Sequence, residues 1–365
     1  MFSANDKISL RQLQVLIILD IFGTGVIILP RRAAALAGRD GWLLVAVAAV
    51  LAMVCTFLVC HLIRLFPGES FFDYAGLLVT KPIAYLLSLG LIAKILIGLV
   101  CELRLFGEII KAILLYNTPL AVIIICLLVV SAYAAAKGIE TRARIGQIVI
   151  WLIFVPLIFV LILVSADVDF TNILPVGEAS PLKIAQGGFM CLSAFSGLEF
   201  ILLISPYLNS HSKAPSRAVT AIALTGILMC IITVITISRF GASNIVNQQW
   251  PVLEMMDAID LPGTFIERQE AIIMSLWILS SFAGVNAGLF FGGVAAQAIF
   301  KSGKWGYYLA AFVLISFTAS IFIKDISVVY EIIDFNFTYL GTAYMLVIPL
   351  VLNLIAWLRG YRYNA

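Results

Sequence analysis

Residues 10–36 read LRQLQVLIILDIFGTGVIILPRRAAAL, and this stretch decides the fold. A helix needs about 20 residues to cross the hydrocarbon core of a bilayer, and this predominantly apolar stretch is longer than that. Gly23, Gly25 and Pro30 interrupt it near its centre. Each Gly costs about 1 kcal/mol of helix propensity relative to Ala and tolerates backbone angles that other residues avoid. The stretch therefore predicts a membrane-spanning helix that is broken at depth.

The composition indicates an all-α integral membrane protein. Of the 365 residues, 62% are hydrophobic and 12% are charged, whereas a soluble domain has roughly 25% charged residues. The six cysteines fall inside apolar blocks, and there are two histidines and a net charge of +3. These features favour neither a metal centre nor a nucleic-acid-binding surface. The sequence contains no nucleophile elbow or phosphate loop, so we expect neither an enzyme nor a bound cofactor.

Apolar blocks bounded by charged residues, Pro or Gly predict ten transmembrane helices. The polar stretch 167–181 separates two sets of five, so we expect one transmembrane domain, residues 1–365, built from repeats 1–166 and 182–360. The predicted spans lie near residues 10–36, 42–66, 82–106, 118–137, 145–165, 183–208, 217–240, 268–299, 305–323 and 335–358.

Basic residues set the predicted orientation. Most Lys and Arg residues fall in segments that share one side when both termini are cytoplasmic, as the positive-inside rule requires. Arg31, Arg32 and Arg39 lie on the other side and are exceptions. A secretory signal ending near residues 33–38 is disfavoured by Asp20 inside the apolar run. The connecting segments 67–81 and 245–266 are predicted to form short interfacial helices.

A break in the first span would create a binding site. Backbone groups that are freed at bilayer depth must find partners, so the helix should open toward a cavity or a ligand. The amides of Gly23, Thr24 and Gly25 would then start a second half-helix, whose dipole favours a carboxylate. The alternative is that these small residues only permit close helix packing.

The sixth span carries a matching interruption, which favours the broken-helix interpretation. Its centre reads Ser193-Ala194-Phe195-Ser196-Gly197-Leu198-Glu199, and Pro206 follows. Paired interruptions at equivalent places in two halves are typical of inverted-repeat transporters with a ligand site at the midplane. We therefore predict a five-plus-five inverted repeat with broken helices 1 and 6. Ser193, Phe195, Ser196 and Gly197 are candidate ligand-binding residues.

Charged residues at bilayer depth need a partner or a function, since each costs about 2.5–3.5 kcal/mol even on insertion scales. Asp20 is predicted either to hold a ligand ammonium, a cation or a proton, or to pair with a lysine or arginine and fix packing. Glu199 either takes up a proton or accepts hydrogen bonds from the freed amides. Lys94 could neutralise Asp20 or Glu199 or replace a bound cation, and Glu102 shares its helix.

Two further predictions concern neighbouring groups. Arg104 and Glu108 are spaced as an i,i+4 pair near the end of their span, which predicts a structural salt bridge. On the eighth span, Ser280, Ser281 and Asn286 would either line the pocket or serve helix packing. Trp277 and Phe195 are candidates to close the pocket over an apolar side chain.

Several motifs together resemble a known family. The first and sixth spans resemble the helix signatures of the amino acid–polyamine–organocation superfamily. More narrowly, the chain resembles the spore germination permeases, the B-type subunits of nutrient germinant receptors. The motifs that carry this narrower resemblance are Ile8-Ser9-Leu10-Arg11-Gln12-Leu13, Glu199 with Pro206-Tyr207-Leu208, and Glu267-Arg268-Gln269-Glu270 before Trp277.

The resemblance implies a ten-helix transporter fold with a pocket for an amino acid or similar germinant between helices 1, 3, 6 and 8. It also implies a membrane-anchored partner subunit and a lipoprotein partner in the spore inner membrane. From the sequence we expect a nutrient-sensing subunit that binds an amino-acid-like small molecule. The second candidate is a stand-alone amino acid transporter coupled to protons or sodium.

Overall fold

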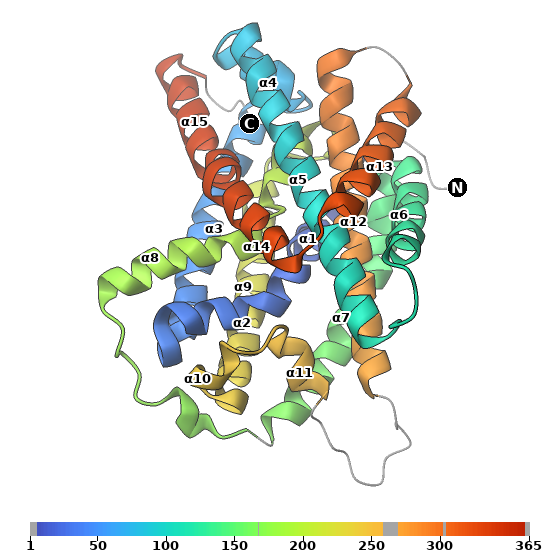
Figure 1. Ribbon diagram of the computed structural model, residues 1–365. Helices are drawn as coiled ribbons and strands as arrows, with labels where there is room; N and C mark the ends of the chain where they lie inside the picture. Colours follow the sequence, from blue (N-terminus) through green and yellow to red (C-terminus); the bar gives the residue numbers. More distant parts are fainter. Residues whose placement is uncertain (1–5, 167, 258–268, 302–303, 362–365) are drawn as a thin grey trace.

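The computed structural model describes residues 6–166, 168–257, 269–301 and 304–361 (Figure 1). This part of the chain is helical and has no strand, apart from an isolated bridge between Ile8 and Leu208. The α-helices are α1 Leu10–Ile21, α2 Thr24–Ala37, α3 Gly41–Leu65, α4 Phe71–Leu78, α5 Lys81–Ile113, α6 Leu120–Ala136, α7 Gly138–Ser165, α8 Pro181–Cys191, α9 Ala214–Phe240, α10 Ala242–Ile245, α11 Pro251–Asp257, α12 Gln269–Phe300, α13 Trp305–Phe322, α14 Ile326–Phe335 and α15 Ile348–Leu358.

Shorter helical turns complete the fold. The 3-10 turns are η1 Gly38–Asp40, η2 Phe170–Ile173, η3 Leu192–Phe195, η4 Leu198–Leu203 and η5 Ser205–Tyr207. Between α14 and α15 the chain forms two π-helical segments, η6 Asn336–Gly341 and η7 Ala343–Val347. Wide π turns are rare and frequently occur at functional sites, so this departure from the α-helix marks the last helix for closer inspection.

Seven helical stretches of the described chain are long and apolar enough to cross a membrane. They are Gly25–Leu65, Lys81–Ile113, Gly138–Ser165, Ala214–Phe240, Met274–Phe300, Trp305–Phe322 and Ile326–Leu358. Each of the ten predicted spans contains a helix, but α1, α8 and the 17-residue α6 fall short of that length. The structure thus agrees with a multi-pass membrane protein, whereas the number of crossings stays a prediction.

Segments that are predicted to share a side of the membrane lie at the same end of the bundle. Figure 1 shows α4 and the end of α15 at one end, and α10 and α11 at the opposite end. Short helices occur in both predicted interfacial segments, namely α4 in 67–81 and α11 in 245–266. Residues 258–266 of the second segment lie outside the described chain.

Two helices begin well before the predicted spans that they contain. The fifth span was predicted from residue 145, but α7 begins at Gly138. The last was predicted from residue 335, but its helix begins at Ile326. In both cases a charged residue was interpreted as lying outside the span, whereas Arg142 is buried inside the bundle and Asp334 of α14 forms an ion pair with Arg32 of α2.

Both predicted interruptions are observed. Helix α1 ends at Ile21, Phe22 and Gly23 leave helical geometry, and α2 begins at Thr24. In the other half, the helical turn ends at Phe195, and Gly197 adopts a left-handed backbone conformation with a φ of +111°. Beyond this point the chain continues as 3-10 turns rather than as an α-helix.

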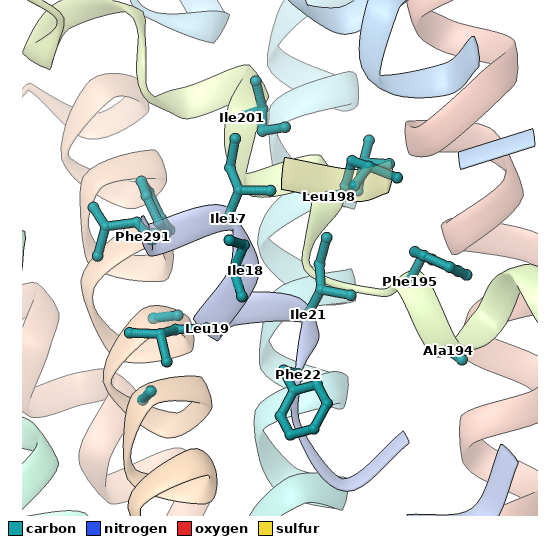
Figure 2. Close-up of a cluster of buried hydrophobic side chains, with 14 of the residues drawn as sticks. Ile17, Ile18, Leu19, Ile21, Phe22, Ala194, Phe195, Leu198, Ile201 and Phe291 are labelled. Atoms are coloured by element: carbon teal, nitrogen blue, oxygen red, sulfur yellow. The ribbon is translucent and has the colours of Figure 1, made fainter. Parts of the chain in front are cut away.

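The two breaks lie against each other. A Cβ atom on Gly197 would lie 2.6 Å from the carbonyl oxygen of Asp20, and one on Gly25 would lie 3.5 Å from the backbone of Ala194. Figure 2 shows Ile21 and Phe22 of the first break beside Phe195 and Leu198 of the second, within one buried apolar cluster. The interruptions thus share one packed centre.

We expect Gly197→Ala to lower the stability of the purified protein by about 1–3 kcal/mol, because Ala disfavours a positive φ and its Cβ would collide with Asp20. The matched control is Gly25→Ala, whose Cβ would make only an ordinary contact. Thermal unfolding in detergent compares the two variants. An equal loss of stability in both would contradict the assigned geometry.

Candidate functional site

A cavity of about 440 Å³ lies between the two breaks. Its walls come from α1, α2 and α5, from the turns around Gly197, and from α12 and the α14–η6 helix. Of the predicted site residues, it is lined by Gly23, Gly25, Ser193, Ser196, Gly197, Asp20, Lys94, Glu102 and Glu199. Residues from five separate regions of the sequence therefore meet in one place.

Two predicted residues, Phe195 and Ser281, do not line this cavity, and the side chain of a third, Thr24, is not described. Phe195 is fully buried in the apolar cluster behind it (Figure 2). Ser281 is buried, and its hydroxyl has no hydrogen-bond partner among the described residues. The backbone of Thr24 begins α2, while its side chain lies outside the described part. Ligand contact by these three residues stays a prediction.

Lys94 and Glu199 form a buried ion pair in the cavity wall. Their side chains are 3% and 2% exposed. The Lys94 ammonium also donates to the Ser196 hydroxyl over 3.2 Å, and the second oxygen of Glu199 accepts the Gly197 amide at 3.0 Å. The pair connects α5 to the second break, so Lys94 neutralises Glu199, one of its two predicted partners.

Asp20 pairs with Arg142 of α7, and both side chains are at most 5% exposed. The Arg142 guanidinium also donates to Asn286 of α12 over 2.9 Å and lies 5.1 Å from the centre of the Phe291 ring. Asn286 in turn donates to the Ser131 carbonyl of α6 over 2.9 Å. This chain of contacts matches the packing alternative for Asp20, although Asp20 also lines the cavity.

Glu102 lies beside the start of α2. A Cβ atom on either Gly23 or Gly284 would lie 3.9 Å from one of its carboxylate oxygens. A helix start attracts negative charge, so this carboxylate is well placed next to α2. A ligand carboxylate at the same place would therefore lie close to Glu102.

The amides of the first break are only partly available. The Gly23 amide already donates to the Ile21 carbonyl over 2.9 Å, and the Val26 amide donates to the Gly23 carbonyl over 3.2 Å. Gly25 is exposed and lines the cavity. The Ser280 hydroxyl donates to the carbonyl of Phe22, which is the packing role predicted for this span. Gly25 is thus more exposed than Gly23, the other glycine of the break.

The cavity wall contains an ion pair that the sequence did not predict. Arg32 of α2 contacts Asp334 of α14 at 2.7 Å and donates to the Ser193 hydroxyl over 3.1 Å. Arg31 donates to the Val246 carbonyl over 3.1 Å. The signal in the sequence was the position of Asp334 directly before the apolar block 335–358, but the predicted span begins after this residue.

The chain near Ile8 pairs with the segment after the second break. Ile8 donates to the Tyr207 carbonyl over 2.7 Å, and Lys7 donates to the Pro206 carbonyl over 2.6 Å. Nearby, the pKa of the His211 imidazole lies below its usual value, mainly because the ring is partly buried. The charge of Lys7 also lowers this pKa, and the hydrogen bond to the Ser205 carbonyl opposes the shift. These contacts fasten the start of the chain to the region beyond the second break.

The comparison with known proteins decides the family. A family model described as spore germination protein matches residues 7–329. The chain belongs to the spore germination permease family. The family resemblance stated from the sequence is thereby confirmed.

Several spore germination proteins are similar to this permease-family chain over most of its length. Spore germination protein B2 of Bacillus subtilis (strain 168) is 26% identical over 98% of both chains. Spore germination protein YndE of the same organism is 26% identical over 82% of this chain and 83% of its own. Spore germination protein GerLB of Bacillus cereus is 24% identical over 76% of this chain and 75% of its own.

Other predicted features of this spore germination permease can now be located. The Arg104–Glu108 salt bridge is confirmed at 2.6 Å. Trp277 is buried and stacks on Phe106 at 5.2 Å rather than lining the cavity. Among the described residues, no group of three or more His, Cys, Asp or Glu side chains could hold a metal ion. Arg142 lies between the predicted spans 118–137 and 145–165, and its buried pair with Asp20 was not predicted.

We expect Arg142→Met to lower stability by about 3–5 kcal/mol, because it leaves the Asp20 charge buried without a partner. The double variant Asp20→Asn with Arg142→Met removes both charges and should recover most of this loss. Thermal unfolding of the purified variants measures both effects. If the double variant is no more stable than Arg142→Met, the pair is not held by charge.

Proposed function

We propose that this chain is the ligand-binding membrane subunit of a nutrient germinant receptor. It binds an amino acid or a similar small metabolite between the two broken helices, and this binding triggers spore germination. The observation that carries the proposal is the cavity of about 440 Å³ at the meeting point of the breaks. Its size lies in the range of small-molecule sites, which is about 300–1,000 Å³.

The proposed architecture has ten spans in two inverted repeats, residues 1–166 and 182–360, with both termini cytoplasmic. Two findings support it. The interruptions occur in the first and sixth predicted spans, which are equivalent places in the two repeats. In addition, α4 and the end of α15 lie at one end of the bundle, away from α10 and α11 (Figure 1). The predicted location is the spore inner membrane.

The cavity combines charge near the breaks with apolar walls. The ligand carboxylate would approach the start of α2 at Gly25, where the helix dipole favours an anion. The ligand side chain would contact an apolar surface. The apolar residues of the wall include Ile28, Leu29, Ile95, Leu99, Phe200 and Phe337.

Ligand binding would shift an equilibrium between two arrangements of the broken helices. A nearly complete response requires the ligand to prefer one state by about 5.5 kcal/mol. The shift would be passed to the partner subunits, a membrane-anchored protein and a lipoprotein. Family membership supports these partners, since the relatives that match are named as spore germination proteins.

We expect Gly25→Leu to weaken amino acid binding by about tenfold or more, since a leucine side chain would occupy space beside the start of α2. Binding of labelled amino acids to the purified protein is the measurement. Gly306→Leu is the matched control, because nothing lies within 4 Å of a Cβ atom at that helical glycine. Equal affinity in wild type and Gly25→Leu would remove the proposed site.

The second candidate is a stand-alone amino acid transporter coupled to protons or sodium. The observation that favours this candidate is the presence of Asp20 and Glu199 in the cavity wall, because acidic residues within a membrane commonly mark ion and substrate pathways.

Reconstitution into liposomes separates the two candidates. We expect the purified chain to bind a labelled amino acid without accumulating it. Accumulation that depends on an imposed proton or sodium gradient, by the chain alone, would instead establish the transporter.

A further inference from the structure

We propose that the Lys94 ammonium occupies, in the empty site, the place of the ligand's amino group on Glu199. A ligand that carries an ammonium group displaces Lys94 from Glu199, while its carboxylate lies at the start of α2. The proposal rests on the proposed function, and it adds the chemical requirement that the ligand carry an ammonium group.

The position of the pair carries this inference. Both residues line the cavity, and Glu199 belongs to the turn that follows the second break. The Glu199 carboxylate is held by the Gly197 amide on one side and by Lys94 on the other. The amide is part of the backbone turn, whereas the ammonium is at the end of a flexible four-carbon stem. Of the two contacts, Lys94 is the one that can move without unfolding the turn.

The charges around the cavity favour exchange with an ammonium group. Among the described residues that line it, the other basic side chains are Arg31 and Arg32, and both have other partners. The acidic residue Glu102 lines the cavity as well, so a displaced Lys94 stays near a carboxylate. A ligand that separates Lys94 from Glu199 must therefore supply the cation that Glu199 loses, since an unpaired buried charge is costly. An amino acid supplies this cation. A carboxylic acid without an amine leaves Glu199 without a cation.

A purely structural role for the pair gives a different expectation. Lys94 also connects α5 to Ser196, and its backbone carbonyl accepts the Asn336 amide over 3.3 Å. If the pair only holds these elements in place, loss of either charge weakens ligand binding. If Lys94 competes with the ligand, the two single variants change affinity in opposite directions.

The experiment measures binding to the purified protein at pH 8 by isothermal calorimetry. The probes are L-alanine, L-valine and L-leucine, each paired with the acid that lacks the amino group: propionate, 3-methylbutanoate and 4-methylpentanoate. Wild type should prefer the amino acid in each pair. Lys94→Met should bind the amino acids about tenfold more tightly, because removal of an internal competitor raises the competent fraction.

Glu199→Gln should bind the amino acids about tenfold more weakly and should lose the preference over the deaminated acids. The double variant, Lys94→Met with Glu199→Gln, should show no preference either. It has no buried charge of the pair left, so its melting temperature should stay near that of the wild type. Lys94→Gln serves in place of Lys94→Met if that variant does not fold.

Weaker amino acid binding in the Lys94 variants would overturn the proposal, and so would an unchanged preference in Glu199→Gln. Either result leaves the proposed function standing as long as wild type binds an amino acid at the Gly25 site. If wild type binds none of the twenty common amino acids, the proposed function is wrong, and the proposal for Lys94 is wrong with it.

Discussion

Backbone groups that are freed inside a membrane have to be satisfied by the protein itself, because lipid offers no hydrogen bonds. The structure meets this constraint at both breaks with partners from the protein itself. The Ser280 hydroxyl donates to the Phe22 carbonyl, and the Gly23 amide donates to the Ile21 carbonyl. At the second break, the Glu199 carboxylate accepts a hydrogen bond from the Gly197 amide. Polar residues are placed in the centre of the bundle for this reason, and the same residues make a site for a polar ligand possible.

Each break is also tied by charge to a helix far away in the sequence. The first break is held through Asp20 to α7, and the second is held through Glu199 to α5. Charges buried at this depth are retained only with a partner, so these pairs restrict how the broken helices can move. A rearrangement of either break must carry its partner helix along or exchange the partner for another charge. This restriction would couple events in the cavity to the rest of the bundle.

The breaks could be predicted from the sequence because their signals are local. Glycines at 23, 25 and 197 weaken a helix whatever its tertiary contacts are. The length of the apolar blocks likewise predicts membrane spans without any knowledge of those contacts. The partners of the buried charges could not be predicted in this way. Arg142 and Asp334 were placed outside the spans since charge usually marks the end of an apolar block. Their burial or pairing depends on residues more than a hundred positions away.

The ion pairs around the cavity differ in how much free energy their separation costs, and this orders the possible movements. The inner pairs are at most 5% exposed, and loss of one partner from such a pair costs about 3–5 kcal/mol. The Arg32–Asp334 pair is 23% and 55% exposed, and pairs open to solvent contribute about 0.2–1 kcal/mol. The crossing between α2 and α14 is therefore the least costly to separate.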